Sequence, residues 1–168
     1  MNYLLAVLVS ALAVAFAAAV QAGEQQIVGW VEKVRLSPGN VLVEAKLDTG
    51  ALHCSLDADN LTYFTRDGVQ WVRFQVEDHL GQKATLARPL VGEANIKRHF
   101  LKYQKRPVVR LGVCLGSFYR EVDVNLVDRS GFQYPMLIGR DFMRGALLID
   151  PKGKHTVEPD CRGQQELE

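Results

Sequence analysis

The fold is decided by residues 41–51, which read VLVEAKLDTGA. Apolar residues occupy every second position of this run up to Leu47, and Glu44 and Lys46 lie between them. Alternation of this kind is typical of a strand that buries one face. The segment therefore predicts a half-buried strand that runs directly into a loop beginning at Asp48.

The loop Asp48-Thr49-Gly50-Ala51 contains the residue types that carboxylate catalysis needs. Peptide hydrolysis requires one group to activate a water and another to protonate the carbonyl oxygen or the leaving amine. Two neighbouring carboxyl groups do both, because they cannot both ionise and therefore share one proton. Gly50 has no side chain, so its N–H can approach the carboxylate, and the Thr49 hydroxyl can brace the loop. The same residues also occur in ordinary turns, so the loop alone is a weak signal.

A second segment, residues 135–142, reads PMLIGRDF. It is an apolar strand that is broken by Gly139 and followed by Arg140, with a short helix expected at 141–144. The combination of this segment with the acidic loop is a much more specific signal than either alone.

The rest of the chain is a series of short strands and turns. Residues 57–64 are expected to form one further short helix. Many short strands with regular turns favour an all-β barrel or closed sandwich. Further strands are expected at 27–36, 69–76, 84–91, 107–115, 118–127, 147–150 and 156–157.

The sequence resembles the retropepsins, in which an active-site loop packs against a later strand that ends in Gly-Arg. It is more similar still to a bacterial family historically labelled ATP-dependent zinc proteases and now viewed as retropepsin-like. The likeness covers residues 27–157. It is carried by Gly29-Trp30 and by residues 46–51, 71–74, 106–109 and 135–140.

This resemblance implies a retropepsin-like closed barrel with one or two short helices. It also implies that Asp48 is catalytic and that a set of neighbours supports its loop. Thr49 and Gly50 would shape the loop, and Gly139 would pack beneath it. The supporting set is Thr49, Gly50, Ala51, Ile138, Gly139 and Arg140.

The sequence departs from these relatives in two places. Many relatives carry a basic residue and then Thr-Ser after the loop, whereas residues 52–55 here read LHCS. Retroviral relatives place an acid there to pair with the arginine after the glycine, so the partner of Arg140 is left open. The interval to Gly139 is longer than in viral proteases, which places a larger flap within residues 80–104, with Gly81 and Gly92 as hinge candidates.

A two-carboxylate centre requires a second copy of this chain. The sequence contains one Asp-Thr-Gly and no internal duplicate. A two-fold homodimer places equivalent residues beside its axis and so brings two copies of Asp48 together. The leading hypothesis is therefore a homodimeric aspartic endopeptidase that hydrolyses peptides or proteins.

Two other functions are open at this stage. The barrel is also suited to a catalytically silent module that holds a peptide in its cleft. A different hydrolase would use Cys54 or Ser55 as nucleophile with the neighbouring His53.

Neither zinc nor ATP is supported by the sequence, and no cofactor is expected. His53, His79, His99 and His155 are scattered without the spacing of metal ligands, and no phosphate-binding glycine loop occurs. The three cysteines, Cys54, Cys114 and Cys161, show no C-x-x-C spacing. They allow at most one internal disulfide, and which pair forms is left open.

Length and composition indicate a single globular domain, and the first residues indicate export. The 168 residues carry a formal net charge of +1, which gives no electrostatic case for nucleic acid. Residues 1–22 predict a secretory signal peptide, with a retained membrane anchor as the alternative. Residues 23–161 are expected to form the peptidase domain in the periplasm, followed by a flexible tail at 162–168. A basic stretch at 97–106 is interpreted as a solvated loop or as a rim that attracts acidic substrates.

Overall fold

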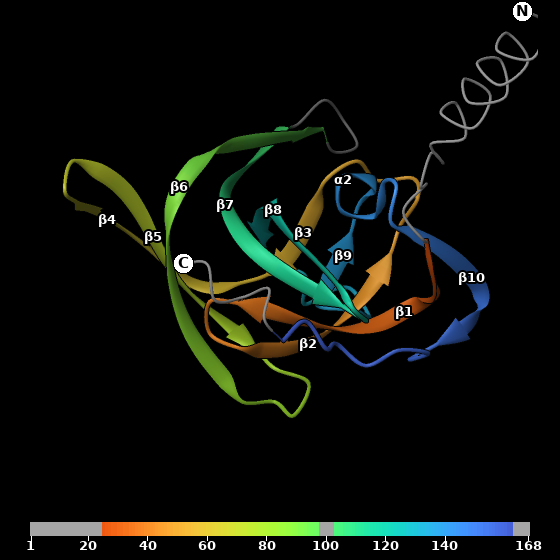
Figure 1. The fold of residues 1–168 in the computed structure, drawn as a ribbon. Helices are drawn as coiled ribbons and strands as arrows, with labels where there is room; N and C mark the ends of the chain where they lie inside the picture. The colour runs from red at the N-terminus through yellow and green to blue at the C-terminus, as the bar shows by residue number, and fades with distance from the viewer. Residues whose placement is uncertain (1–24, 98–102, 163–168) are drawn as a thin grey trace, which may run out of the picture.

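The structure is a computed structural model that describes residues 25–97 and 103–162. Nearly all regular structure in this part is strand, and Figure 1 shows the strands curving around a common interior. The predicted signal peptide and most of the predicted tail lie outside the described residues. The all-β fold class expected from the sequence is confirmed.

The described elements follow one another in a simple order. They are β1 (Gln26–Ser37), β2 (Val41–Leu47), β3 (Cys54–Asp57), β4 (Asp59–Arg66), β5 (Val69–Glu77), β6 (Lys83–Lys97), β7 (Tyr103–Leu115), β8 (Phe118–Val127), β9 (Met136–Ile138), α2 (Arg140–Met143) and β10 (Leu147–Lys154).

Six strands close into a barrel, as expected from the sequence. Their order is β1, β2, β9, β3, β8 and β7, and the ring is completed where the end of β1 pairs with β7. At this seam Arg35 lies opposite Cys114. β10 adds to β1 in parallel, and β6, β5 and β4 continue the sheet beyond β7.

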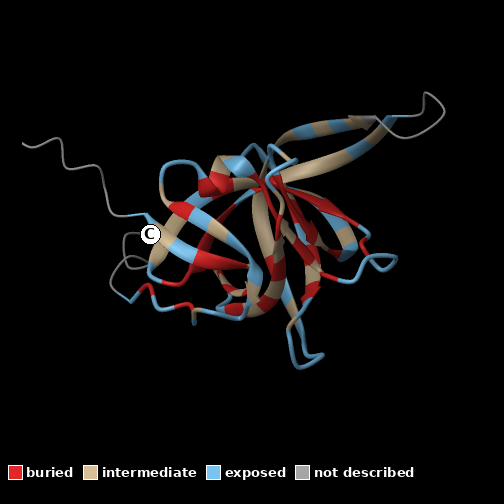
Figure 2. Ribbon diagram, turned by 90° about the vertical axis from the view of Figure 1, so that its right-hand side faces the viewer, coloured by how far each residue is buried: buried red, intermediate tan, exposed pale blue. Residues whose placement is uncertain are grey.

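The barrel is filled by side chains from alternating strand positions. In β2 every second residue is buried, which confirms the half-buried strand predicted at 41–47. Leu111 of β7, Phe142 of α2 and Phe74 of the neighbouring strand β5 are completely buried in one apolar core. Figure 2 shows buried residues on many of the strands. Burying a side chain of this size contributes about 1.5–3 kcal/mol, so this interior supplies most of the favourable free energy of folding.

β9 brings residues 135–142 next to the strand and acidic loop at 41–51. It lies between β2, with which it pairs in parallel, and β3, with which it pairs antiparallel. Leu47 is opposite Ile138, so the chain leaves β2 and β9 at the same edge of the sheet. Asp48 and Gly139 therefore become neighbours although they are far apart in the sequence.

β6 is longer than the strand predicted at 84–91. Its first part pairs with β5 as far as Pro89, and from Leu90 onward it pairs with β7. Proline has no N–H to donate to a ladder, so a position where pairing changes partners accommodates it. The second part of β6 and the start of β7 form an arm that extends beyond the barrel (Figures 1 and 2).

Two of the predicted elements are wrong, and one short helix is confirmed. Residues 57–64 form the end of β3 and most of β4, because Thr62, Tyr63 and Phe64 pair with β5. These are strand-favouring residues, and the pairing overrides any helical tendency. Residues 156–157 are not a strand, since Thr156 is bonded to a buried carboxylate described below. The predicted helix at 141–144 corresponds to α2.

The C-terminal segment is fixed to the barrel by a disulfide between Cys114 and Cys161. Cys114 lies at the end of β7, and the N–H of Asp160 donates to the carbonyl of Gly116 at 2.7 Å. Cys54 remains a free, buried thiol. The structure thus decides which cysteine pair forms, a question that the sequence left open.

A buried carboxylate makes a second attachment of the C-terminal segment to β1. The side chain of Glu32 is completely buried. It accepts hydrogen bonds from the N–H of Gly29 at 2.6 Å and of Thr156 at 3.0 Å, and also from the Thr156 hydroxyl. A buried charge is tolerated when hydrogen bonds of this kind satisfy it, so Glu32 joins the residues after β10 to the barrel.

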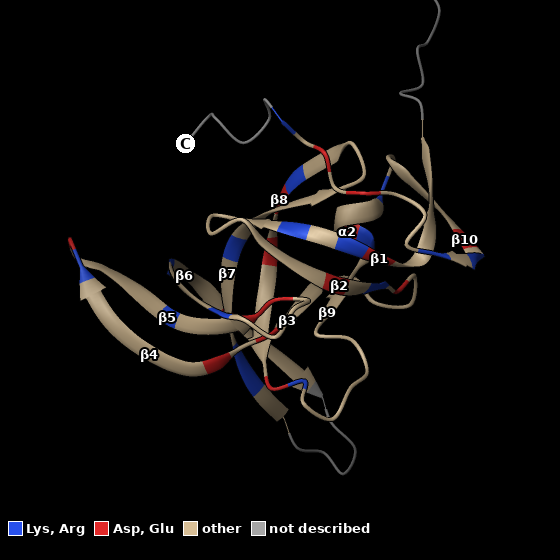
Figure 3. Ribbon diagram, turned by 90° about the horizontal axis from the view of Figure 1, so that it is seen from below, with Lys and Arg blue, Asp and Glu red and all other residues tan. Residues whose placement is uncertain are grey.

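Charged residues of both signs are interspersed over the strands, as Figure 3 shows. In the basic stretch at 97–106, Lys105 pairs with Glu93 at 3.1 Å, and Arg106 bonds to Gln104 and Asn125. The side chains of residues 97–102 lie outside the described part of the chain.

Candidate active site

The acidic loop after β2 is held at the edge of the barrel by its own backbone. The N–H of Asp48 donates to the carbonyl of Ile138 at 2.9 Å, and the N–H of Ala51 donates to the carbonyl of Asp48 at 3.2 Å. The Oδ1 atom of Asp48 accepts the N–H of Gly50 at 2.9 Å. This bond has the form expected from the sequence, and it fixes the direction of the carboxylate.

The first residues of α2 attach this loop from behind. The N–H groups of Arg140 and Asp141 donate to the carbonyls of Ala51 and Leu52, each at 3.0 Å. The guanidinium of Arg140 donates to the carbonyl of Thr49 at 2.6 Å. A main-chain carbonyl therefore takes the place of the acidic partner that the sequence did not provide for Arg140.

Gly139 lies where no side chain fits. A Cβ atom added there would be 2.5 Å from the carbonyl oxygen of Leu52 and 2.6 Å from that of His53. Real Cβ atoms do not approach main-chain atoms so closely. Close packing of β9 against the acidic loop therefore depends on this glycine.

We expect Gly139→Ala to displace the loop and to lower the free energy of unfolding by about 1–3 kcal/mol, the usual cost of overpacking. Urea unfolding followed by circular dichroism measures this change. Gly131→Ala is the matched control, because an added Cβ there meets nothing within 4 Å. Equal unfolding midpoints for the two variants would show that the close contact at Gly139 is unimportant.

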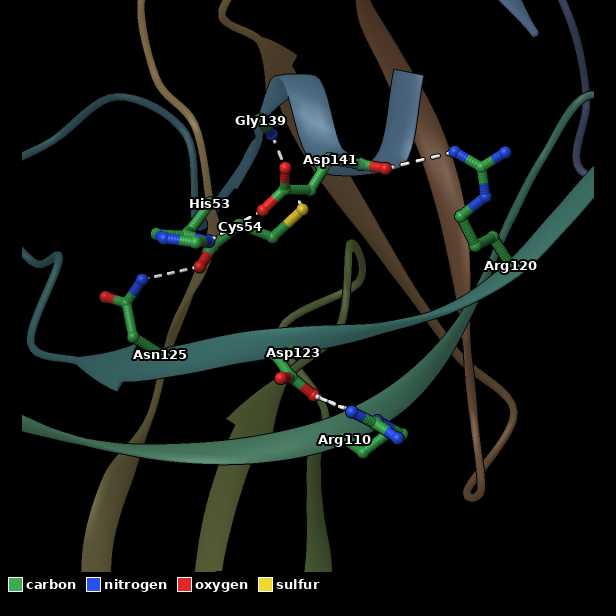
Figure 4. A network of polar contacts seen from close by, with 8 residues as sticks. All are labelled: His53, Cys54, Arg110, Arg120, Asp123, Asn125, Gly139 and Asp141. Atoms are coloured by element: carbon green, nitrogen blue, oxygen red, sulfur yellow. Dashed lines mark hydrogen bonds and ion pairs between the residues drawn. The ribbon is translucent and has the colours of Figure 1, made fainter. Parts of the chain in front are cut away.

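A polar network lies beside the loop, between α2 and β8. Nδ1 of His53 and Oδ2 of Asp141 lie 2.7 Å apart, and both side chains are partly exposed. From β8, Asn125 donates through its amide nitrogen to the carbonyl of Cys54 at 2.5 Å, and Arg120 donates to carbonyls of α2 (Figure 4). These contacts join the loop, the helix and the barrel wall.

The thiol of Cys54 is unsuited to nucleophilic catalysis. It is completely buried, and its sulfur accepts the N–H of Gly139 at 3.4 Å. Burial raises the pKa of this thiol to about 11, and the nearby Asp141 adds to the increase. The thiolate is the reactive form, so this environment argues against Cys54. Ser55 is also buried, and its hydroxyl accepts a hydrogen bond from Arg129 at 2.8 Å.

We expect Cys54 in the folded protein to resist alkylation by iodoacetamide at pH 8. A pKa near 11 leaves far less thiolate at that pH than the ordinary value of 9.0 does, about 100-fold less. Mass spectrometry of native and urea-unfolded protein measures the difference, with labelling expected only after unfolding. Rapid labelling of the native protein would contradict the buried position.

A cleft of about 600 Å³ opens beside Asp48. Aromatic residues form part of its wall: Trp30 and Tyr134 meet edge to face with ring centres 5.9 Å apart. β6 and β7 contribute Ile96 and Arg106, so the arm reaches the cleft. The complete lining is Trp30, Lys46, Asp48, Ala51, Leu52, His53, Ser55, Ile96, Arg106, Asn125, Arg129, Phe132, Gln133, Tyr134 and Leu137.

The cleft has an excess of positive charge. Lys46, Arg106 and Arg129 line it together with a single carboxylate, that of Asp48. Arg129 is only 7% exposed. Burial lowers the pKa of its guanidinium, against the opposing influence of Asp57 and Asp48.

The structure brings together all the site residues that the sequence analysis named. Asp48 is half-buried at the cleft, Thr49 and Gly50 are exposed, and Ile138 is buried in β9. The predicted flap at 80–104 corresponds in part to the arm, but residues 98–102 lie outside the described part, and the flap remains a prediction.

The sequence analysis missed several residues of the cleft. It gave Trp30 and Lys46 no role in a cleft, and it did not name Arg129; Arg106 belonged to the basic stretch that was interpreted as a loop or a rim. Arg129 follows β8 in a loop without any local pattern, so no sequence signal marks it. The alternation of β8 placed Asn125 on a polar face, which is a weak signal at most.

Among residues 25–97 and 103–162, no three His, Cys, Asp or Glu side chains are grouped in a way that would hold a metal ion. In the same residues, no helix has the length and apolar character that crossing a membrane requires.

Comparison with known proteins gives the family. The model of the RimB-like family, described as retropepsin-like aspartic endopeptidase RimB, matches residues 27–160. The crystal structure of Lpg0085, a Legionella pneumophila protein of unknown function (DUF785), is 37% identical with a TM-score of 0.70 and covers 80% of this chain and 100% of that one.

Curated relatives are larger proteins. The chain is 30% identical over 118 residues to a probable alpha-L-glutamate ligase of Parasynechococcus marenigrum and 32% identical over 126 residues to one of Shewanella halifaxensis. These matches cover 68% and 73% of this chain but only 25% and 26% of the relatives, so the chain spans about a quarter of their length. The family match extends over most of the described barrel, including the acidic loop and the strand behind it, and the chain belongs to the RimB-like family of retropepsin-like proteins.

Proposed function

We propose that this protein is an exported aspartic endopeptidase whose active centre is formed by the Asp48 carboxylates of two identical chains. The observation that carries the proposal is the geometry of the acidic loop. Asp48 lies at an open cleft, and its Oδ1 is oriented by the N–H of Gly50. The residues next to it, Thr49 and Gly50, are exposed and therefore accessible to a second copy of the loop.

In the proposed reaction the two carboxyl groups share one proton. The ionised carboxylate takes a proton from water as the water oxygen bonds to the scissile carbonyl carbon. The protonated carboxyl gives its proton to the carbonyl oxygen. The tetrahedral intermediate then breaks its C–N bond as the protonated carboxyl transfers its proton to the leaving nitrogen. The ionised carboxylate takes a proton from one hydroxyl of the intermediate, which leaves the new acid and restores the single shared proton.

The proposed substrate class is an acidic peptide. Curated relatives are named probable alpha-L-glutamate ligases, which links glutamate to proteins that contain a segment similar in sequence to this chain. The excess of positive charge in the cleft supports the same class.

A peptide library tests this function. Residues 23–168 are incubated with the library from acidic to neutral pH, and products are identified by mass spectrometry. We expect cleavage of acidic peptides, inhibition by pepstatin, and a sedimentation velocity profile of a dimer. A monomer that cleaves normally at working concentration would refute the shared active centre.

A second candidate is a peptide-binding module without catalysis on the same barrel. The ligase names of the curated relatives favour it, because there a similar segment belongs to a larger protein that is not named as a peptidase. Binding of peptides without turnover in the library experiment would establish this alternative.

A further inference from the structure

Arg129, which follows β8, is a buried charged residue in the wall of the Asp48 cleft. Its guanidinium donates to the carbonyl of Tyr134 at 3.2 Å and to the hydroxyl of Ser55 at 2.8 Å. The ring of Phe132 lies against it, with Cζ 4.6 Å from the ring centre. These contacts hold the planar cation in a fixed orientation in the wall of the Asp48 cleft.

The charge of Arg129 has no counter-ion in direct contact. Both oxygen atoms that accept from its guanidinium are neutral, and within the described residues no carboxylate oxygen lies within 4.0 Å of it. Asp57 is close in the fold, but its carboxylate accepts the main-chain N–H of Arg129. A buried cation is costly unless an anion pairs with it. Asp48 and Asp57 act on this charge without touching the guanidinium, so a further anionic group in the cleft would be stabilised by direct contact with Arg129.

The neighbouring cations strengthen this conclusion. Arg106 is held by two bonds to the side-chain oxygen of Gln104, at 3.1 and 3.0 Å, and by one to that of Asn125 at 3.0 Å. Lys46 lines the same cleft. In a shared centre the two Asp48 carboxylates carry a single negative charge between them, which leaves each cleft positive.

We propose that Arg129 is the specificity-determining residue of a carboxylate-binding subsite beside Asp48. The proposal rests on the proposed function for the peptide nature of the ligand. The planar guanidinium forms paired N–H···O bonds with a carboxylate, a geometry that lysine does not reproduce. The carboxylate belongs either to an acidic side chain or to the C-terminus of the peptide.

The first experiment uses the wild-type protein and four peptides of one length. They differ only in a single Glu or Gln near the cleaved bond and in a free or amidated C-terminus. We expect kcat/KM to be about 10–100-fold higher for peptides with the recognised carboxylate, the usual gain from a charge-assisted hydrogen bond. Dependence on Glu identifies a side chain, and dependence on the free end identifies the α-carboxylate. Equal kcat/KM for all four peptides overturns the proposal.

The second experiment changes the arginine. In Arg129→Lys and Arg129→Met we expect the preference for the carboxylate peptide to fall below about threefold. Neither side chain has the planar guanidinium that forms paired N–H···O bonds. Arg66→Met removes the same charge at the exposed end of β4 and is expected to retain the wild-type preference. Retention of that preference in Arg129→Lys also overturns the proposal. If Arg129→Met does not fold, the lysine variant and the four peptides with wild-type protein still test the proposal.

Binding measurements separate this inference from the proposed function. Calorimetry with the Asp48→Asn protein measures affinity for the same peptides without cleavage. If the wild-type protein cleaves no peptide but the Asp48→Asn protein binds the carboxylate peptide at least about tenfold more tightly, the subsite stands and the peptidase proposal fails. Equal binding of all four peptides rejects the subsite even if cleavage is observed.

Discussion

Replacement of Asp48 by asparagine is expected to lower kcat for peptide hydrolysis by at least about 10³-fold, because proton transfer by a positioned carboxyl contributes about 10²–10⁴-fold and the loss affects both halves of the shared centre. The amide cannot take a proton from water. Its oxygen can still accept the N–H of Gly50, so the loop and the fold should be preserved. Steady-state hydrolysis and urea unfolding, measured on the same preparation, check both statements.

Asp67→Asn is the matched control for this substitution. Asp67 is exposed in the turn between β4 and β5, and asparagine tolerates its positive φ of 52°. We expect this variant to retain wild-type kcat. An Asp48→Asn protein with more than about a tenth of wild-type kcat would be incompatible with catalysis by a carboxyl group at this position.

The same variant also tests symmetry. In an equal mixture with wild-type chains, random pairing leaves about one quarter of dimers with two intact carboxyls, so activity per total protein should fall to about one quarter. Independent monomers would retain about one half. Subunit exchange is verified by native mass spectrometry before the assay.

Replacement of Glu32 by alanine is expected to have the largest effect on stability, a loss of about 3–5 kcal/mol, because a buried charged acceptor is removed while its donors stay buried. The donors left without a partner include the N–H of Thr156 and the N–H of Val157, which are bonded at 3.0 and 3.4 Å. The midpoint of urea unfolding measures the change.

Glu44→Ala provides the contrast for Glu32→Ala. The carboxylate of Glu44 pairs with His155 at 2.8 Å, but both side chains are partly exposed. Such surface pairs contribute about 0–1 kcal/mol, so the midpoint should change little. If both alanine variants unfold at the same urea concentration, burial of Glu32 is not what stabilises the C-terminal segment.

The sequence was most informative where one local pattern determines one local structure. The alternation in residues 41–47 belongs to a strand that buries one face, and the apolar run with Gly139 belongs to β9. The residue types of Asp48 and Gly50 were enough to predict that the N–H of Gly50 approaches the carboxylate of Asp48. Resemblance to a known family then supplied the closed barrel, which local patterns alone left undecided between a barrel and a sandwich.

The features that the sequence did not predict correctly have a common cause, which is contact between segments distant in the sequence. Residues 57–64 were assigned to a helix because their pairing with β5 is not visible locally. The burial of Glu32 depends on Thr156, and that of Arg129 on Ser55. A charged residue that is buried by a remote partner has the same sequence signature as one on the surface.

The disulfide between Cys114 and Cys161 makes the last third of the fold a covalent ring. β8, β9, α2 and β10 all lie within it, and so does the loop that carries Arg129. A single proteolytic cut anywhere inside the ring leaves the two pieces linked through sulfur. A nicked molecule would differ from the intact one only by the water added at the cut, until a reductant separates the fragments.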